Sequence, residues 1–217
     1  ANIAQTLALT DNLIESEPWL RKSIEAFQTA GEDADASSAM GNLAEVLRVQ
    51  PHRLDEARQI AEESLKIQRK LDPNAVHNWK IYSVLAEISE SQQDFTTGTQ
   101  YRQLARQAFF NFPGCRHQLK RELMFIVPGI LRVIEQPEEK EKVTALLGRV
   151  SIHLGFDISP SIRRILDGER NEALLCEQLR YKEGAIIMTI LRAIEDPDEF
   201  KQWFQKDFSR WKEEDSS

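Results

Sequence analysis

Apolar residues recur at helical spacing in two stretches of this chain, and both stretches follow the same order of apolar, small and polar positions. The first runs from Asn42 to Pro73 and the second from Val84 to Pro113. Each stretch has Leu-Ala-Glu near its start, a short polar interruption at the equivalent position and a proline at its end. Equivalent residues of the two stretches are about 42 positions apart. Self-similarity at such a period indicates an architecture of stacked repeats.

Each stretch predicts a helix, a short turn and a second helix. After the polar break the apolar positions step by four, three and four residues, which is one face of an α-helix. These positions are Ile60, Ser64, Ile67 and Leu71 in the first stretch, and Tyr101, Ala105, Ala108 and Phe112 in the second. Small residues lie where paired helices must approach closely, namely Ala44, Ala57, Ala86 and Gly98. Because one helix pair cannot bury its apolar face alone, we predict an all-α solenoid.

The segment before these stretches continues the pattern in a weaker form. Ser23-Ile24 precedes Ser64-Leu65 by about 41 residues, which keeps the period. Residues 1–33 are therefore interpreted as a degenerate unit, whose second helix has Pro18 in its first turn and ends near Gly31. The chain begins without Met and within a helical pattern, so we expect a segment of a larger protein.

We divide the chain into a repeat region at 1–113, with clearer units near 34–73 and 75–113, and a helical C-terminal region at 114–217. For the second region two interpretations stay open, namely divergent repeats plus a cap that continue the superhelix, or a separate helical domain. The first expected helix covers 116–135, with a kink or break at Pro128-Gly129, and another follows Pro137. A further helix has Ser159 as cap and Pro160 as its first residue. The stretch 171–196 predicts one long helix or two bent at Gly184, and the last helix follows an Asp196 cap.

The last helix carries an aromatic stripe. Such a stripe fits either a cap that seals the apolar segment 186–194 or a face that binds a partner, and we favour the cap because solenoids need closed ends. The stripe consists of Phe200, Phe204, Phe208 and Trp211, with Trp203 beside it.

The stretch LAEVLR…RLDEARQIAEESLKIQRKL resembles a tetratricopeptide repeat, and the spacing of about 42 is similar to the longer repeats of kinesin light chain type. Leu43-Ala44 and Leu85-Ala86 match the start of the first helix, and a proline closes each unit. The aromatic residue that the family has early in the first helix is Met40 in one unit and Tyr82 in the other. The large apolar residue that it has in the second helix is replaced by Ala61 and Arg102. The resemblance implies a right-handed α-solenoid, of a kind that large bacterial regulatory proteins carry in many copies.

The resemblance also implies a concave groove, lined by the first helices of successive units, that binds a peptide or a helix. Leu43, Leu47, Leu85 and Ile88 point to the core, so the groove candidates lie off that stripe: Asn42, Glu45, Arg48, Lys80, Ser83, Glu87 and Glu90. The amide of Asn42 can hold a peptide backbone. The glutamates favour a basic partner, while Arg48 and Lys80 favour an acidic group. A plain solvated helix face is the competing interpretation.

The net charge of −7 disfavours nucleic acid and anionic membranes as partners, and favours a basic or neutral protein or peptide, including other domains of a parent chain. The two cysteines, Cys115 and Cys176, have no CxxC spacing and indicate reduced thiols in a cytoplasmic protein. The longest apolar run, 123–131, is far shorter than the roughly 20 residues that span a bilayer.

No motif for catalysis, phosphate binding or zinc is present, so we expect a non-catalytic interaction module without a cofactor, serving as a sensor or scaffold segment. Two alternatives stay open. One is a self-assembling structural protein that stacks through Ile3, Leu7 and Leu9. The other is an all-α enzyme with a polar pocket at the Pro128 kink.

Overall fold

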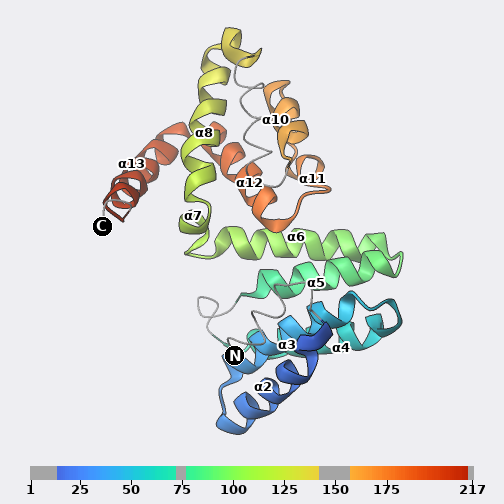
Figure 1. The fold of residues 1–217 in the computed structure, drawn as a ribbon. Coiled ribbons are helices and arrows are strands. Elements are labelled where there is room, and N and C mark those ends of the chain that lie inside the picture. Colours follow the sequence, from blue (N-terminus) through green and yellow to red (C-terminus); the bar gives the residue numbers. More distant parts are fainter. Residues whose placement is uncertain (1–13, 72–76, 142–156, 215–217) are drawn as a thin grey trace. The chain divides into compact units, whose positions relative to one another are not determined.

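The computed structural model describes residues 14–71, 77–141 and 157–214 of the chain. Within these ranges every regular element is a helix and there is no β-strand, which confirms the all-α prediction. The chain divides into two compact units, Ala1–Phe112 and Pro113–Ser217 (Figure 1). Each unit is described separately.

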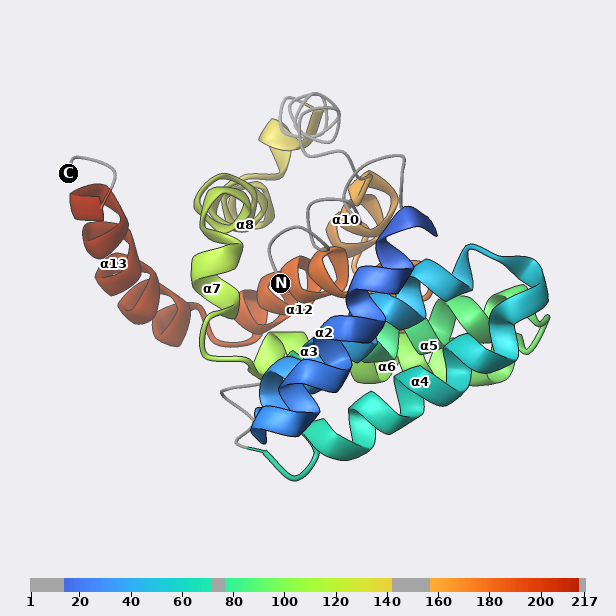
Figure 2. The same ribbon diagram turned by 60° about the horizontal axis from the view of Figure 1, so that its bottom comes forward.

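The N-terminal unit is built from helix pairs that lie side by side (Figure 2). The pairs α3/α4 and α5/α6 are the two predicted helix–turn–helix units, and α2 is the second helix of the degenerate unit. The positions proposed for stacking, Ile3, Leu7 and Leu9, lie outside the described residues. The elements are η1 (Ile14–Ser16), α2 (Glu17–Ala30), α3 (Asp33–Arg48), η2 (Pro51–Arg53), α4 (Leu54–Gln68), α5 (Asn78–Ser91) and α6 (Phe95–Asn111).

The apolar stripe predicted from the repeat forms the core of this unit. Leu47, Leu85 and Ile88 are fully buried, and Leu43 is 1% exposed. The small residues serve close helix packing as expected, since Ala44, Ala57 and Ala86 are also fully buried. Helices α3 and α5 approach closely at Gly41, where a Cβ atom would collide with Cδ1 of Ile81 and the end of that side chain would have to move. Close packing of α3 on α5 brings the first helices of the two units together.

A cluster of four charged side chains joins α2 to the turn before α4. Arg53 donates to Glu17 at 2.6 and 2.9 Å and to Glu56 at 2.8 Å. Arg21 donates to Glu17 at 2.9 Å and to Glu56 at 2.5 Å, so the two arginines and two glutamates alternate around a closed ring. Hydrogen bonds from Arg53 are the largest cause that lowers the pKa of both carboxyls. We call these four residues the ion cluster.

The next junction in the repeat is held by different residues, with Arg58 at the position equivalent to Glu17. Arg58 of α4 donates to Oε1 of Gln92, in the turn before α6, at 2.7 Å. The Gln92 amide in turn donates to Oδ1 of Asp55 at 2.8 Å. Polar contacts therefore fix the second helix of one unit to the turn of the next at both junctions.

The C-terminal unit is centred on α8 and α12, with α12 packed across α8 (Figure 2). Its core includes Leu123, Val127, Ile130, Ile186 and Ile190, all fully buried. The elements are α7 (Cys115–Gln118), α8 (Lys120–Glu135), η3 (Pro137–Glu139), α10 (Ser159–Leu166), α11 (Glu172–Leu175), α12 (Tyr181–Glu195) and α13 (Pro197–Glu214). Most of the helix expected after Pro137 lies outside the described residues.

Two predicted boundaries in this unit were wrong. The break in 171–196 does not fall at Gly184, which is buried inside α12, but between Leu175 and Tyr181. The Glu183 carboxylate accepts the backbone N–H of Arg180 at 2.8 Å, and this bond fixes the start of α12. Ser159 is not a cap but the first residue of α10, where its N–H is bound by the carboxylate of Asp157 at 2.9 Å.

Pro128 does not break its helix, since α8 runs from Lys120 to Glu135 with the proline inside it. The proline is half-buried, on the side of the helix near Phe125, which is 68% exposed. Solvent is within reach there and can replace the backbone hydrogen bond that a proline removes. The interruption lies earlier, at Leu119 between α7 and α8.

The aromatic stripe of α13 is divided between core and surface. The predicted cap is confirmed, because the Asp196 carboxylate accepts the N–H of Glu199 at 2.9 Å. Phe200 and Trp211 are buried, and α13 packs on α12. Both are features expected of a helix that covers the apolar segment 186–194. The remaining rings of the stripe are half-buried and stack along the helix, at 5.2 Å between Phe200 and Phe204 and 5.8 Å between Phe204 and Phe208.

Candidate interaction surface

The groove candidates lie on two neighbouring helices of the N-terminal unit. On α3, the candidates follow one another at steps of three residues, and on α5 they follow at steps of three and four, so each set forms one stripe. Asn42, Glu45, Ser83 and Glu87 are half-buried, and Lys80 is exposed. Since α3 and α5 pack together, the two stripes belong to one face of this unit.

Three of the candidates form a charge cluster that links the two helices. Arg48 donates to Glu45 at 2.5 and 2.9 Å on its own helix, and its other nitrogen lies 3.1 Å from Oε2 of Glu87 on α5. The hydrogen bonds from Arg48 to Glu45 raise the pKa of the guanidinium, against the effect of burial. A ligand that approaches here therefore meets a preformed arrangement of two carboxylates around one guanidinium, with a net negative charge.

Glu90 belongs to a different contact. Both of its carboxylate oxygens accept from Arg102 on α6, each at 2.5 Å. The side chain also packs over Gly98, where a Cβ atom would lie 2.8 Å from Cγ of Glu90. Glu90 thus fixes α5 to α6. The residue at which the second unit departs from the family pattern, Arg102, supplies the partner for this glutamate.

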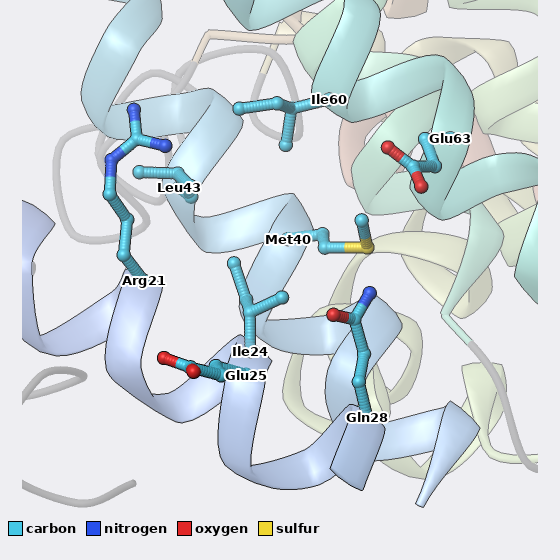
Figure 3. Close-up of a pocket in the computed structure, with 8 residues that line it drawn as sticks. All are labelled: Arg21, Ile24, Glu25, Gln28, Met40, Leu43, Ile60 and Glu63. Carbon is cyan, nitrogen blue, oxygen red and sulfur yellow. The ribbon is translucent and has the colours of Figure 1, made fainter. Parts of the chain in front are cut away.

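A pocket that sequence reasoning missed lies on the other side of α3, between α2 and α4 (Figure 3). It has a volume of about 370 Å³. Along α3, Met40 and Leu43 point away from Glu45, because residues five apart differ by about 140° around a helix and those two apart by about 160°. The lining residues are Arg21, Ile24, Glu25 and Gln28 of α2, Met40 and Leu43 of α3, and Ile60 and Glu63 of α4. The departure at Met40 was the one sequence signal for it.

The C-terminal unit offers no comparable chemistry in the part that the structure describes. The residues beside Pro128 are packed as core, with Val127 and Ile130 fully buried, which disagrees with the polar pocket that an active site there requires. Cys115 and Cys176 are buried, unbridged thiols, and burial raises the pKa of Cys115 to about 12. Across the described ranges, no group of three or more His, Cys, Asp or Glu side chains is placed to hold a metal ion.

Comparison with known proteins gives one match. Residues 1–70 match the family model of the tetratricopeptide repeat. The matched part covers the degenerate unit and the helices α3 and α4, whereas α5 and α6 lie beyond it. No curated protein and no solved structure gives a significant match to the chain. None of the helices in the described ranges is both long and apolar enough to span a membrane. The match and the structure agree: residues 1–70 are similar in sequence to the tetratricopeptide repeat, and α3 and α4 within this range form a helix pair.

Proposed function

We propose that this chain is a non-catalytic protein-interaction module that binds a peptide or helix of a partner protein on the face formed by α3 and α5. The observation that carries the proposal is the tetratricopeptide repeat match, since such repeats generally mediate contacts between proteins. The stripes on α3 and α5 supply a backbone-binding amide at Asn42, a hydroxyl at Ser83 and an exposed ammonium at Lys80.

The charge cluster on this face supports a polar mode of binding. Glu45, Arg48 and Glu87 hold one another in place, so a ligand is recognised without first ordering these long side chains. The cluster carries one more carboxylate than guanidinium, and this excess favours a basic group on the partner. Glu90 contributes to the rigidity of α5 through Arg102 rather than through contact with a ligand.

We further propose that the module acts as a sensor or scaffold segment of a larger regulatory protein, whose other domains are among the candidate partners. The buried, unbridged thiols Cys115 and Cys176 support a reducing compartment such as the cytoplasm.

Site-specific photo-crosslinking tests the proposed face. A photoreactive amino acid is placed at Lys80 or Ser83 on α5 and, as a control, at the exposed Lys66 on α4. We expect one and the same partner to be cross-linked in cells from both positions on α5, and not from Lys66. A partner captured equally from Lys66 contradicts binding on the α3/α5 face.

A second variant pair separates recognition from folding. Lys80→Glu changes an exposed charge on the proposed face, whereas Lys66→Glu makes the same change outside it. Loss of the cross-linked product from Ser83 in Lys80→Glu alone supports the assignment. Equal yields in both variants argue that Lys80 takes no part in binding.

A further inference from the structure

Two of the residues that line the pocket between α2 and α4, Met40 and Ile60, have aromatic counterparts in the next unit. Met40 is equivalent in the repeat to Tyr82, at an offset of about 42 residues, and Ile60 is equivalent to Tyr101, at an offset of about 41. The two tyrosine rings stack with centroids 6.3 Å apart and an interplanar angle of 28°, packed against the core. The pocket therefore has an aliphatic and a thioether side chain where the next unit has two aromatic rings.

The floor of the pocket is apolar. Met40 and Leu43 are 5% and 1% exposed, and Ile24 and Ile60 are half-buried on the flanking helices. In Figure 3 these side chains converge from α2, α3 and α4 on a common space. Four of the eight lining residues are apolar and four are polar or charged, so the site is suited to an apolar side chain flanked by polar groups.

The rim of the pocket is acidic. Glu25 on α2 and Glu63 on α4 are exposed and stand on the two walls. The one basic lining residue, Arg21, is balanced within the ion cluster by Glu17 and Glu56. The repeat offset places Lys66 and Leu104 at the positions equivalent to Glu25 and Glu63, so the acidic rim is a property of this pocket and not of the repeat.

We propose that this pocket binds a basic amphipathic helix of a partner protein, which inserts apolar side chains between α2 and α4 and sets Lys or Arg against Glu25 and Glu63. Two helices that stand apart over an apolar floor form the kind of groove that accepts a third helix. The site lies on the side of α3 that faces away from Glu45 and shares no residue with the α3/α5 face. It therefore stands or fails independently of the function proposed above.

The test uses two alanine-based helical peptides that share a pair of leucines one turn apart. The leucines are flanked by lysines in one peptide and by glutamates in the other. Binding is followed through the methyl signals of the three methionines in the intact chain. Met40 reports on the pocket, whereas Met124 and Met188 belong to the C-terminal unit and serve as internal references.

We expect the lysine-flanked peptide to shift the Met40 signal alone, with an affinity roughly tenfold higher than that of the glutamate-flanked peptide. The variant Glu25→Lys/Glu63→Lys should reverse this preference. A matched control, Glu62→Lys/Glu195→Lys, makes the same change in net charge at exposed positions outside the pocket and should leave the preference unchanged.

A second variant fills the pocket with the side chains of the neighbouring unit. Met40→Tyr/Ile60→Tyr should abolish binding of the fluorescently labelled lysine-flanked peptide while the thermal unfolding midpoint stays at or above that of the natural chain. The proposal is overturned if neither peptide moves the Met40 signal, if both bind equally, or if the tyrosine variant binds as before. A Met40 shift that depends on protein concentration alone identifies a second copy as the occupant and also overturns it.

Discussion

Removing one carboxylate from the ion cluster should destabilise the N-terminal unit more than removing an exposed carboxylate nearby. Glu17 is 16% exposed at its side chain and accepts hydrogen bonds from both Arg53 and Arg21. The substitution Glu17→Gln keeps the shape of the side chain but removes its charge. Arg53, which is 23% exposed, then keeps only Glu56 as an ionised partner within the cluster.

The expected cost follows from the exposure of the two ion pairs that are lost. A fully exposed pair contributes about 0.2–1 kcal/mol, and a hydrogen bond between buried charged groups contributes about 1.5–3 kcal/mol. The Glu17–Arg53 pair lies between these limits, and the Glu17–Arg21 pair is close to the exposed one because Arg21 is 45% exposed. We therefore expect Glu17→Gln to lower the free energy of unfolding by about 1–2 kcal/mol, or the unfolding midpoint of this 217-residue chain by roughly 2–8 °C.

Urea unfolding monitored by circular dichroism measures this cost, with Glu62→Gln as control. Glu62 is 54% exposed and lies 4.0 Å from Arg58, so its substitution should cost no more than about 0.5 kcal/mol. A double-mutant cycle with Arg53→Gln should return a coupling energy of about 1 kcal/mol between Glu17 and Arg53. The structural role of the cluster would be refuted if Glu17→Gln and Glu62→Gln lowered the free energy of unfolding equally and the coupling energy between Glu17 and Arg53 were near zero.

The same cluster predicts the pH dependence of stability. Because the pKa values of Glu17 and Glu56 are lowered in the folded chain, their contribution is present above the ordinary value of 4.5 and is lost as pH falls through the folded values. The natural chain should therefore lose stability below about pH 4.5 more steeply than Glu17→Gln. If the free energy of unfolding fell equally steeply with pH in the natural chain and in Glu17→Gln, the proposed contribution of Glu17 would be contradicted.

Three further predictions follow from burial. Leu47→Ala, at a fully buried position, should cost about 2–5 kcal/mol in urea unfolding, whereas Val49→Ala, at 41% exposure, should cost less than about 0.5 kcal/mol. Cys115 and Cys176 should react with a thiol reagent only after denaturation, because both are buried and the pKa of Cys115 is raised to about 12; a fast native reaction would contradict this. Burial and Lys80 lower the pKa of His77, so stability should fall as pH drops below about 6.5, and His77→Phe should remove that slope in thermal unfolding.

The repeat made the apolar skeleton of the N-terminal unit predictable. Leu43, Leu85 and the small residues Ala57 and Ala86 recur at fixed spacing because each packs against an equivalent neighbour, and all of them are buried in the structure. Pattern reasoning was weaker in the C-terminal unit, where the chain has no repeat to compare with itself. The break before Tyr181 depends on one hydrogen bond from Arg180 to Glu183, and hydrophobic spacing carries no information about such a bond.

The polar surface was predictable only in outline. Helical spacing correctly placed Glu45, Arg48 and Glu87 off the core stripe, but it could not show that these three side chains contact one another across α3 and α5. Glu90 shares their stripe on α5 and yet pairs with Arg102 on α6, since the absence of a side chain on Gly98 brings the two helices close at that point. Which charges pair depends on interhelical distances that a single sequence does not contain.

The positions at which the two units differ carry the features specific to this chain. At one junction a carboxylate on the helix, Glu17, meets an arginine in the turn, while at the next junction the helix supplies the cation, Arg58, and the turn supplies Gln92. A unit docked out of order would place like charges together or leave a charge without its partner, so these contacts favour one order of units along the solenoid. The pocket follows the same logic, because Met40 and Ile60 line it at the positions where the next unit has the stacked pair Tyr82 and Tyr101. In a repeat chain the common residues therefore determine the fold, and the residues that break the repeat are the ones to test for binding.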